Sequence, residues 1–382
     1  MNDIVHNPSF FCGLSVQLPI KELSMFRIIT QVTLCFFALS GCNFLDEQSD
    51  TQKLKGLLAQ HAQKHQIPAQ GLLVLHQDKE VFKDVYSSEL FKKEHALNKD
   101  SLFPIYSISK LFASILILQF VEEQKIALDS PASMYVKGLP IGWQNIPVSA
   151  FLNHASGVPE YFERDVKQFT FAPNKQETFE RLKAKPVHFA PATKIRYTQT
   201  NYLVLAAILE SVSGVNYEKL VEQRILTPLG MNSTLRLQLS ERYPNVVKTY
   251  HVKAGKLIEF KPIQWPDYSA AHGGYYSNLD DIGRFLSAVA AGKLISQTQL
   301  QKYFQPYRLR DGNIGYFASG WDYGRNWQFQ ELGHDGGTLS RVRILFKDKL
   351  DDAYIIVYFT NGNSDGVWSR VLVDAVQSSL SL

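Results

Sequence analysis

The stretch Phe103-Pro-Ile-Tyr-Ser107-Ile-Ser-Lys110-Leu-Phe-Ala-Ser-Ile-Leu-Ile-Leu118 places a serine and a lysine at the start of a long apolar run. If a helix begins near Ser107, residues three apart lie on one face, so the Lys110 ammonium can reach the Ser107 hydroxyl. No charged residue follows until Glu122, which predicts a helix buried on all sides. Burial lowers the pKa of a lysine, so Lys110 could accept the Ser107 proton.

A less specific interpretation of the same pair stays open. A serine three residues before a lysine is common by chance, and a lysine at a helix start usually extends its ammonium to water. Motifs elsewhere in the chain are therefore needed to decide between the two interpretations.

The composition is that of an ordinary globular protein. The 382 residues are 45% hydrophobic and 20% charged, enough for one large or two modest domains. The net charge of +4 is small, and no dense basic run with interleaved aromatic residues occurs, so a nucleic-acid partner is not expected. His61 and His65 have a metal-ligand spacing on a helix predicted over residues 52–65, but no third ligand is evident. We expect a polar helix face there, with no metal or other cofactor.

The amino terminus resembles a bacterial lipoprotein signal. From Met25 the chain has a basic start and a short apolar run that ends in Leu39-Ser-Gly-Cys42, similar to a lipobox. We expect cleavage before Cys42 and lipid on that cysteine, with Met25 as the start of translation. An uncleaved apolar anchor or a buried first helix is the alternative.

This organisation predicts a signal region over residues 1–41, a polar tether over 42–53 and one domain over 54–382. The expected location is the cell envelope, lipid-anchored and facing the periplasm. Asn43 after the cysteine weakly favours an outer membrane over an inner one.

Strand-like runs occur near both ends of the domain. A hairpin is predicted over residues 71–76 and 81–86, and further strands over 316–321, 342–346 and 353–360. An amphipathic helix is predicted over 280–291, and a closing helix over 367–380. Residues 131–270 show mainly helical signals, the clearest from Tyr202 to Val212 with a stop at Gly214. The pattern predicts an α/β fold, in which the two chain ends form one sheet flanked by helices, plus an all-helical subdomain.

Two further motifs accompany the opening pair. Tyr197-Thr-Gln199 precedes a predicted helix, and His334-Asp-Gly336-Gly337 precedes a predicted strand. With Ser107 and Lys110 they resemble the three motifs of the penicillin-recognising serine hydrolases. The branch in question contains class C β-lactamases, a D-alanyl-D-alanine carboxypeptidase and related esterases. The resemblance covers nearly all of residues 55–380, and the supporting stretches follow the family's order: residues 151–157, 228–234 and 273–277, then Asp280 or Asp281.

The resemblance implies a β-lactamase-like fold with an antiparallel sheet, and specific roles for the motif residues. Ser107 would be acylated, and Tyr197, close to Lys110, would exchange the proton with a lowered pKa. The main-chain N–H groups of Ser107 and Gly337 would hold the oxyanion. Gly336 and Gly337 would let a substrate backbone lie close to the strand.

Three positions depart from the family pattern. Gln199 replaces the usual asparagine, so its amide lies one methylene further out. His334 replaces the lysine of typical β-lactamases, and a histidine is mostly neutral at pH 7. Ser340 and Arg341 replace a glycine and an aromatic residue. Arg341 could supply the missing charge for a substrate carboxylate, or it could face water.

The expected function is that of a lipid-anchored serine hydrolase. It would act through a covalent acyl-enzyme on a peptide, amide or ester, as β-lactamases, DD-peptidases and esterases do. The expected substrate is a small molecule or a peptidoglycan peptide. The alternative is a penicillin-binding receptor without turnover, or an inactive scaffold of the same fold.

Overall fold

The computed structural model describes residues 50–92, 97–164, 169–236, 238, 242–254, 256–259, 263–326, 328–363 and 370–379. The predicted signal region, Cys42 and most of the predicted tether lie outside the described residues. A helix covers residues 50–65, so it starts at least two residues earlier than predicted. Among the described residues, no helix combines the length and the apolar character needed to cross a bilayer. The described residues also contain no group of three or more His, Cys, Asp or Glu side chains that could hold a metal ion.

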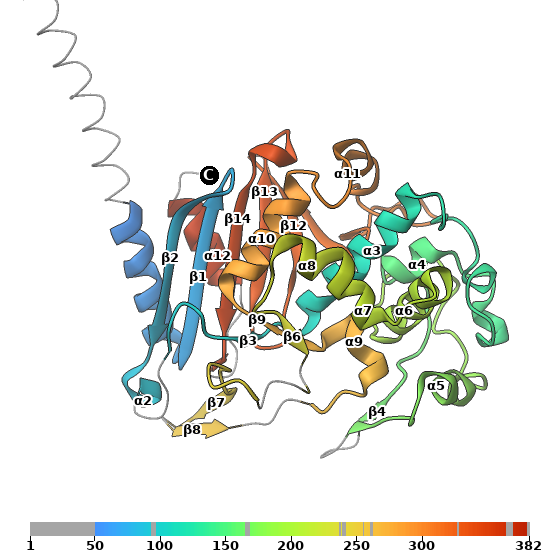
Figure 1. Ribbon diagram of the computed structural model, residues 1–382, viewed down its shortest axis with the longest axis horizontal. Coiled ribbons are helices and arrows are strands. Elements are labelled where there is room, and N and C mark those ends of the chain that lie inside the picture. The colour runs from blue at the N-terminus through green and yellow to red at the C-terminus, as the bar shows by residue number, and fades with distance from the viewer. Residues whose placement is uncertain are drawn as a thin grey trace, which may run out of the picture. The chain divides into compact units, whose positions relative to one another are not determined.

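The two ends of the domain form one antiparallel sheet, as predicted (Figure 1). Its strand order is β10-β11-β12-β13-β14-β1-β2. The N-terminal β1 pairs with the C-terminal β14, with Leu72 opposite Tyr358. The bounds are β1 (Ala69–His76), β2 (Lys79–Ser87), β10 (Phe317–Ala318), β11 (Trp321–Arg325), β12 (Gln330–Asp335), β13 (Arg341–Phe346) and β14 (Tyr354–Thr360).

Two parts of the sheet differ from the prediction. The single strand predicted over residues 316–321 is instead a tight hairpin of β10 and β11, because Ser319 and Gly320 turn the chain with φ values of 48° and 84°. Strand β12 was not predicted. Its sequence, Gln-Glu-Leu-Gly-His-Asp, has only one aliphatic side chain, so its pairing with β11 and β13 carries little local signal.

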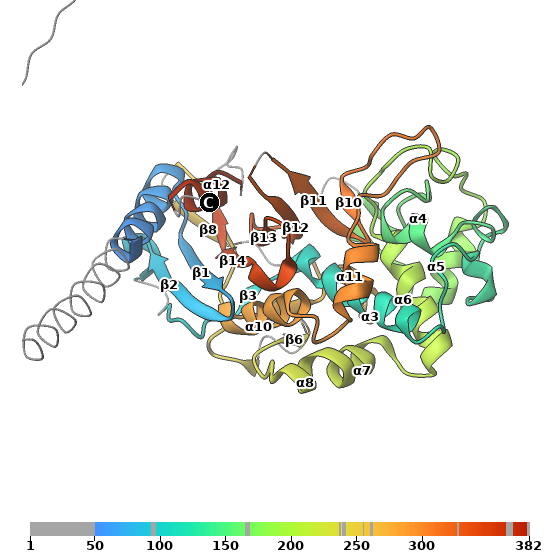
Figure 2. The same ribbon diagram turned by 90° about the horizontal axis from the view of Figure 1, so that it is seen from above.

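Helices cover both faces of the sheet. Because successive side chains of a strand point to opposite faces, the sheet separates two hydrophobic cores. Ile355, Val357 and Phe359 of β14 belong to the main core, which also contains α3 (Lys110–Glu122) and α10 (Leu279–Ala290). Ile356 and Tyr358 point to a second core with the 50–65 helix and α12 (Arg370–Ser379). Figure 2 shows these helices on opposite sides of the strands.

The predicted insertion is helical for most of its length. Helix α6 (Thr200–Ser213) is followed by Gly214, whose φ of 68° is a left-handed cap, at the predicted stop. Short strands accompany the helices, which the sequence did not predict. The elements are α4 (Val148–Leu152), β4 (Glu163–Arg164), β5 (Phe169–Thr170), α5 (Lys175–Leu182), α6 (Thr200–Ser213), α7 (Tyr217–Val221), α8 (Thr227–Leu229), β6 (Leu235–Arg236), β7 (Tyr250–Lys253) and β8 (Lys256–Glu259).

A small second sheet brings distant segments beside the Ser107 stretch. β3 (Phe103–Pro104) pairs with β9 (Tyr275–Ser277), and the N–H of Ile105 donates to the carbonyl of Tyr275 at 3.1 Å. This pairing places α9 (Ala270–Gly273) against the one-turn 3-10 helix η1 (Tyr106–Ser109). The remaining helices include α2 (Glu89–Lys92) and α11 (Gln297–Tyr303).

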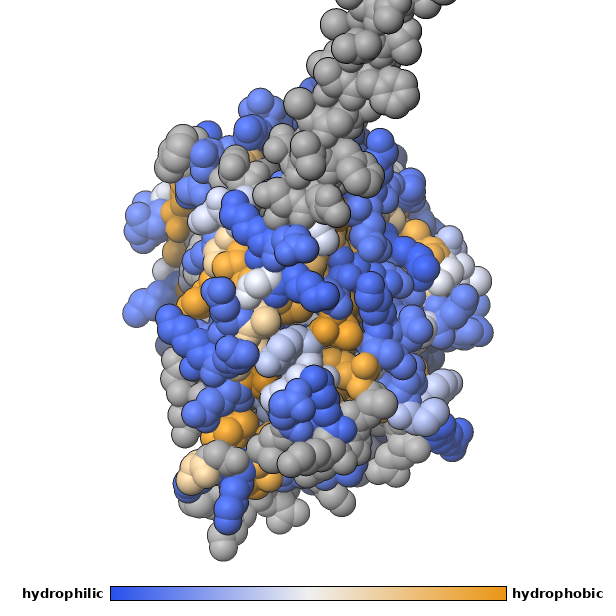
Figure 3. Space-filling model, turned by 90° about the vertical axis from the view of Figure 1, so that its left-hand side faces the viewer, coloured by the Kyte–Doolittle hydropathy of each residue, from blue (hydrophilic) through white to orange (hydrophobic). Residues whose placement is uncertain are grey.

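One edge of the main sheet is polar. β2 lies at one end of the strand order and carries Lys79, Glu80, Lys83 and Asp84. The side of the molecule that carries β2 and the 50–65 helix is mostly hydrophilic (Figure 3). Charges along an edge strand oppose pairing with another chain.

Candidate active site

Ser107 lies in the 3-10 turn η1, directly before α3. Tyr106, the residue before it, has a φ of 42°, a left-handed conformation that costs free energy for a non-glycine residue. A Cβ at Gly337 would lie 3.2 Å from the Tyr106 ring, so the β12–β13 turn packs closely against this residue. The serine is therefore presented by a constrained turn.

Lys110 is fully buried at the start of α3 and contacts three polar atoms. Its Nζ lies 3.2 Å from Ser107 Oγ, 2.6 Å from Gln199 Oε1 and 2.7 Å from the carbonyl oxygen of His272. Burial lowers the pKa of Lys110 well below its ordinary value, although the charges of Glu160 and Asp322 act in the opposite direction. A neutral amine has two N–H groups and one lone pair. With Gln199 and His272 as acceptors, the lone pair is left for the Ser107 hydroxyl.

Tyr197 completes the contacts of Ser107. Its hydroxyl donates to Ser107 Oγ at 2.8 Å, and its ring centroid is 4.9 Å from the Lys110 Nζ. The expectation of a lowered Tyr197 pKa is wrong. Although the residue is 37% exposed, desolvation raises this pKa, as do the charges of Asp322 and Glu160; the bond to Ser107 opposes the rise only partly. Tyr197 is thus a neutral hydrogen-bond donor.

Gln199 binds Lys110 through its side chain and is itself held by Glu160. The N–H of Gln199 donates to Glu160 Oε2 at 3.0 Å, and Thr200 Oγ1 donates to Glu160 Oε1 at 3.2 Å. This carboxylate lies at the N-terminus of α6, where a helix favours negative charge. The extra methylene of Gln199 therefore does not prevent contact with the lysine.

His334 lies near the end of β12, so the motif precedes β13 as predicted, and the histidine is buried. Its Nδ1 donates to the Asp335 carbonyl at 2.8 Å, because a carbonyl can only accept. Burial lowers the pKa of His334, assisted by Lys110 and opposed by Asp322. The ring centroids of His334 and Tyr197 are 6.0 Å apart, so a neutral imidazole lies beside the tyrosine.

The glycines of the third motif allow close packing. A Cβ at Gly336 would lie 3.0 Å from the carbonyl oxygen of Ile105 and 3.4 Å from Ile108 Cδ1. The absence of a side chain lets the turn after β12 approach the Ser107 stretch.

Arg341 is buried and forms an ion pair with a carboxylate. Its Nη1 lies 3.0 Å from Asp335 Oδ2, and its side chain is 4% exposed. Neighbouring Arg343 contacts Asp335 Oδ1 at 2.8 Å and lies 3.6 Å from Asp322. Both arginine charges are therefore balanced by carboxylates.

Several contributors to this site were not predicted. His154 lies inside the quoted 151–157 stretch; its ring is 4.3 Å from the Tyr197 ring, and its Nδ1 lies 2.9 Å from the Asn201 amide nitrogen. Glu160 acts on a residue 39 positions away, and His272 acts through its backbone carbonyl. Sequence spacing does not indicate a contact between residues this far apart, nor a contact that a backbone carbonyl makes.

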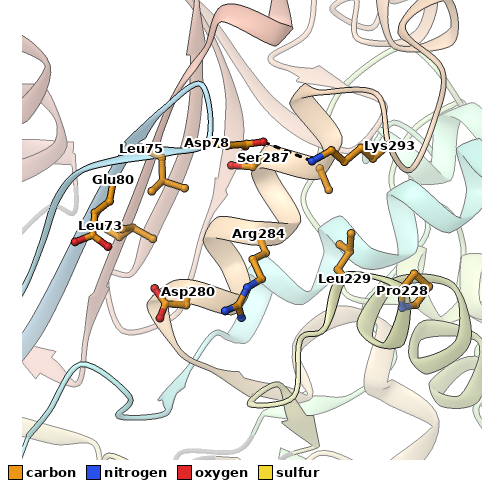
Figure 4. Close-up of a pocket in the computed structure, with 11 residues that line it drawn as sticks. Leu73, Leu75, Asp78, Glu80, Pro228, Leu229, Asp280, Arg284, Ser287 and Lys293 are labelled. Carbon is orange, nitrogen blue, oxygen red and sulfur yellow. Dashed lines mark hydrogen bonds and ion pairs between the residues drawn. The ribbon is translucent and has the colours of Figure 1, made fainter.

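A surface pocket of about 460 Å³ lies elsewhere, between the β1–β2 hairpin, α8 and α10 (Figure 4). Most of its charged groups form ion pairs: Lys293 lies 3.5 Å from Asp78, Asp280 lies 2.6 Å from Lys83, and Arg284 lies 2.8 Å from Asp281. None of the predicted site residues lines this pocket. The chemistry described above is confined to the surroundings of Ser107.

Solved structures resemble this fold. The hydrolase EstCE1, described as having promiscuous acyltransferase activity, superposes with a TM-score of 0.72 at 15% identity, covering 88% of this chain and 99% of its own. D-amino acid amidase from Ochrobactrum anthropi SV3 has a TM-score of 0.68 at 21% identity and covers 88% and 99%. At these identities the likeness shows the fold, which is the predicted one.

Several bacterial proteins are similar to this chain in sequence. Penicillin-binding protein 4* of Bacillus subtilis is 25% identical over 311 residues, 75% of this chain and 67% of the relative. A putative D-alanyl-D-alanine carboxypeptidase of Escherichia coli O157:H7 is 23% identical, over 61% of this chain and 62% of its own length. This chain thus spans about two thirds of the relatives' length. A family model described as Beta-lactamase matches residues 54–374. The chain therefore belongs to the β-lactamase family.

Proposed function

We propose that this protein is a serine hydrolase that acts through an acyl-enzyme on Ser107. The observation that carries the proposal is the position of Ser107 Oγ, 3.2 Å from Lys110 Nζ and 2.8 Å from the Tyr197 hydroxyl. A nucleophile between a base and an acid is what acyl transfer requires. The E. coli relative named as a putative D-alanyl-D-alanine carboxypeptidase supports the reaction class.

The protonation states of Lys110 and Tyr197 determine how protons move during acylation. Neutral Lys110 accepts the Ser107 proton while Oγ attacks the substrate carbonyl carbon. Tyr197, whose raised pKa keeps it protonated, then gives its proton to the departing oxygen or nitrogen, and Lys110 returns a proton to Tyr197. Water subsequently attacks the acyl carbon, and the same groups move the protons in reverse.

The oxyanion is assigned to two main-chain N–H groups. Ser107 is the second residue of η1, and the first N–H groups of a helix have no acceptor within it. Gly337, in the turn after β12, packs on Tyr106. Two preorganised donors at a developing oxyanion lower the barrier by several kcal/mol, about 3 or more for each donor.

The charges around the site favour uncharged substrates. A carboxylate-bearing substrate needs a cation, but burial keeps His334 neutral, and Asp335 contacts both Arg341 and Arg343. Glu160 and Asp322 add negative charge near Lys110. We therefore assign esters or amides without a carboxylate beside the scissile bond as the preferred class.

The location is also part of the proposal. The Leu39-Ser-Gly-Cys42 sequence supports export as a lipoprotein held in the cell envelope, facing the periplasm and in an outer membrane where one exists.

The first prediction concerns the nucleophile. Ser107→Ala should lower ester hydrolysis by at least about a thousandfold, as loss of a catalytic serine does elsewhere, while the thermal unfolding midpoint stays close to wild type. Intact-protein mass spectrometry with an activated ester should locate the acyl group on Ser107. Ser109→Ala is the matched control and should keep its activity; an acyl group on Ser109 would refute the assignment.

The second prediction concerns the base. The Glu160 charge raises the pKa of Lys110, so Glu160→Gln, which keeps an amide oxygen as acceptor, should lower that pKa further. Neutral Lys110 then persists to lower pH, and the acidic limb of kcat/KM should move to lower pH. Asp322→Asn should move it in the same direction. A shift of the limb to higher pH in both variants would show that Lys110 is not the base.

The third prediction concerns substrate charge. The wild type should have a higher kcat/KM for a short neutral ester than for a cephalosporin. His334→Lys should raise the cephalosporin-to-ester ratio, because the lysine adds a cation for the substrate carboxylate; an increase of about fivefold would correspond to about 1 kcal/mol. His334→Gln, which adds no charge, is the control. A wild type that prefers the cephalosporin, and loses that preference in Arg341→Ala, would identify Arg341 as a carboxylate anchor instead.

The fourth prediction concerns the anchor. Cys42→Ser should move the protein from the membrane fraction to the soluble fraction of the expressing cells, because acyl chains supply most of the membrane affinity of a lipoprotein. Mass spectrometry should find diacylglycerol on Cys42 of the wild type. A Cys42→Ser protein that remains full length and membrane-bound would show that another segment holds it.

A further inference from the structure

Two large apolar side chains stand in solvent close to the predicted catalytic tyrosine. Ile314 is 61% exposed and Tyr316 is 55% exposed. We call these two residues the apolar rim. Tyr197 is itself 37% exposed. Most large apolar side chains of the described residues are buried, and a cluster of exposed ones indicates a binding surface.

Tyr316 of the rim is linked to Tyr197 through one buried ring. Phe317 is 2% exposed, and its ring centroid lies 4.8 Å from that of Tyr316 and 6.5 Å from that of Tyr197. Phe317 also packs on His154, at 4.9 Å between centroids. The Tyr197 and Tyr316 rings therefore both lie against the buried Phe317 ring, which places Tyr316 and the segment that carries it beside Tyr197.

The rim is held in place by its backbone. Tyr307 N–H donates to the Phe317 carbonyl at 2.7 Å, and Gly315 N–H donates to the Tyr307 carbonyl at 2.8 Å. A Cβ at Gly315 would lie 2.4 Å from Ile195 Cδ1, so this glycine lets the segment pack against the residues that precede Tyr197. A preorganised apolar surface binds a ligand without first paying for the ordering of a loop.

The chemistry of the occupant follows from the neighbouring groups. Tyr197 is the proton donor nearest Ser107, so the surface beside Tyr197 lies on the leaving-group side of the scissile bond. Asp322 is close enough for its charge to raise the pKa of both Tyr197 and Tyr316. An anionic leaving group would be repelled here, whereas an uncharged apolar one would be retained.

We propose that Ile314 and Tyr316 bind the apolar alcohol or amine portion of an uncharged ester or amide, the part that leaves with the Tyr197 proton. This inference rests on the proposed function and adds the chemical class of the leaving group. Ile314 and Tyr316 are specificity residues here, since neither contacts the reacting atoms in the mechanism above.

Ethyl, butyl and hexyl acetate test the proposal, because their alkoxides leave with nearly equal basicity and differ only in apolar length. In the wild type, kcat/KM measured by pH-stat titration should rise by about tenfold or more from ethyl to hexyl acetate, since each buried methylene can add up to about fourfold. In the double variant Ile314→Ala, Tyr316→Ala that rise should fall below about threefold. Hydrolysis of ethyl acetate should stay within about twofold of wild type, because the short chain does not reach the rim.

Val371→Ala is the matched control, since Val371 is 45% exposed on α12 against the other face of the sheet. It should keep the full chain-length dependence. A wild type without chain-length dependence, or a double variant that retains it, would overturn the rim while leaving the serine hydrolase intact. If no ester is hydrolysed in a Ser107-dependent manner, the proposed function fails and the rim fails with it.

Discussion

The arrangement depends on burying one amine, that of Lys110, among polar atoms from three separate segments. Gln199 Oε1 and the His272 carbonyl oxygen lie 2.6 and 2.7 Å from its Nζ, and Ser107 Oγ lies 3.2 Å away. A buried ammonium is costly, and the desolvation that disfavours it leaves a base next to the serine. The apolar character of α3 on all sides, which removes water from Lys110, is therefore part of the chemistry as well as of the core.

The other elements can be understood as supports for these three segments. Pairing of β3 with β9 brings α9 and the His272 carbonyl to Lys110. Glu160 fixes the N-terminus of α6 and with it Gln199. Gly336 and Gly337 let the turn after β12 pack on η1 without a clash. Small changes in any of these contacts would alter the position or the charge state of the lysine.

The sequence predicted the features that depend only on residues close to one another in the chain. The Ser107 and Lys110 spacing is a relation within one turn, and the alternation in β1 and β14 is a relation within one strand, so both are visible in the sequence. The Ser319-Gly320 turn and β12 were missed because a turn conformation and a weakly apolar central strand are decided by tertiary pairing. The raised pKa of Tyr197 was missed because it depends on desolvation and on carboxylates from other elements. Arg341 could not be placed, since its Asp335 partner is a pairing across β12 and β13.

The protonation state of Lys110 tests the account most directly. An NMR titration of the domain labelled at lysine side chains can follow the Lys110 signal, assigned by its absence from a Lys110→Met variant. The account predicts a titration midpoint well below the ordinary lysine value of 10.5, with a neutral amine at the pH of turnover. A Lys110 signal that titrates together with the exposed lysines would contradict the account, because a cationic lysine cannot take the proton of Ser107.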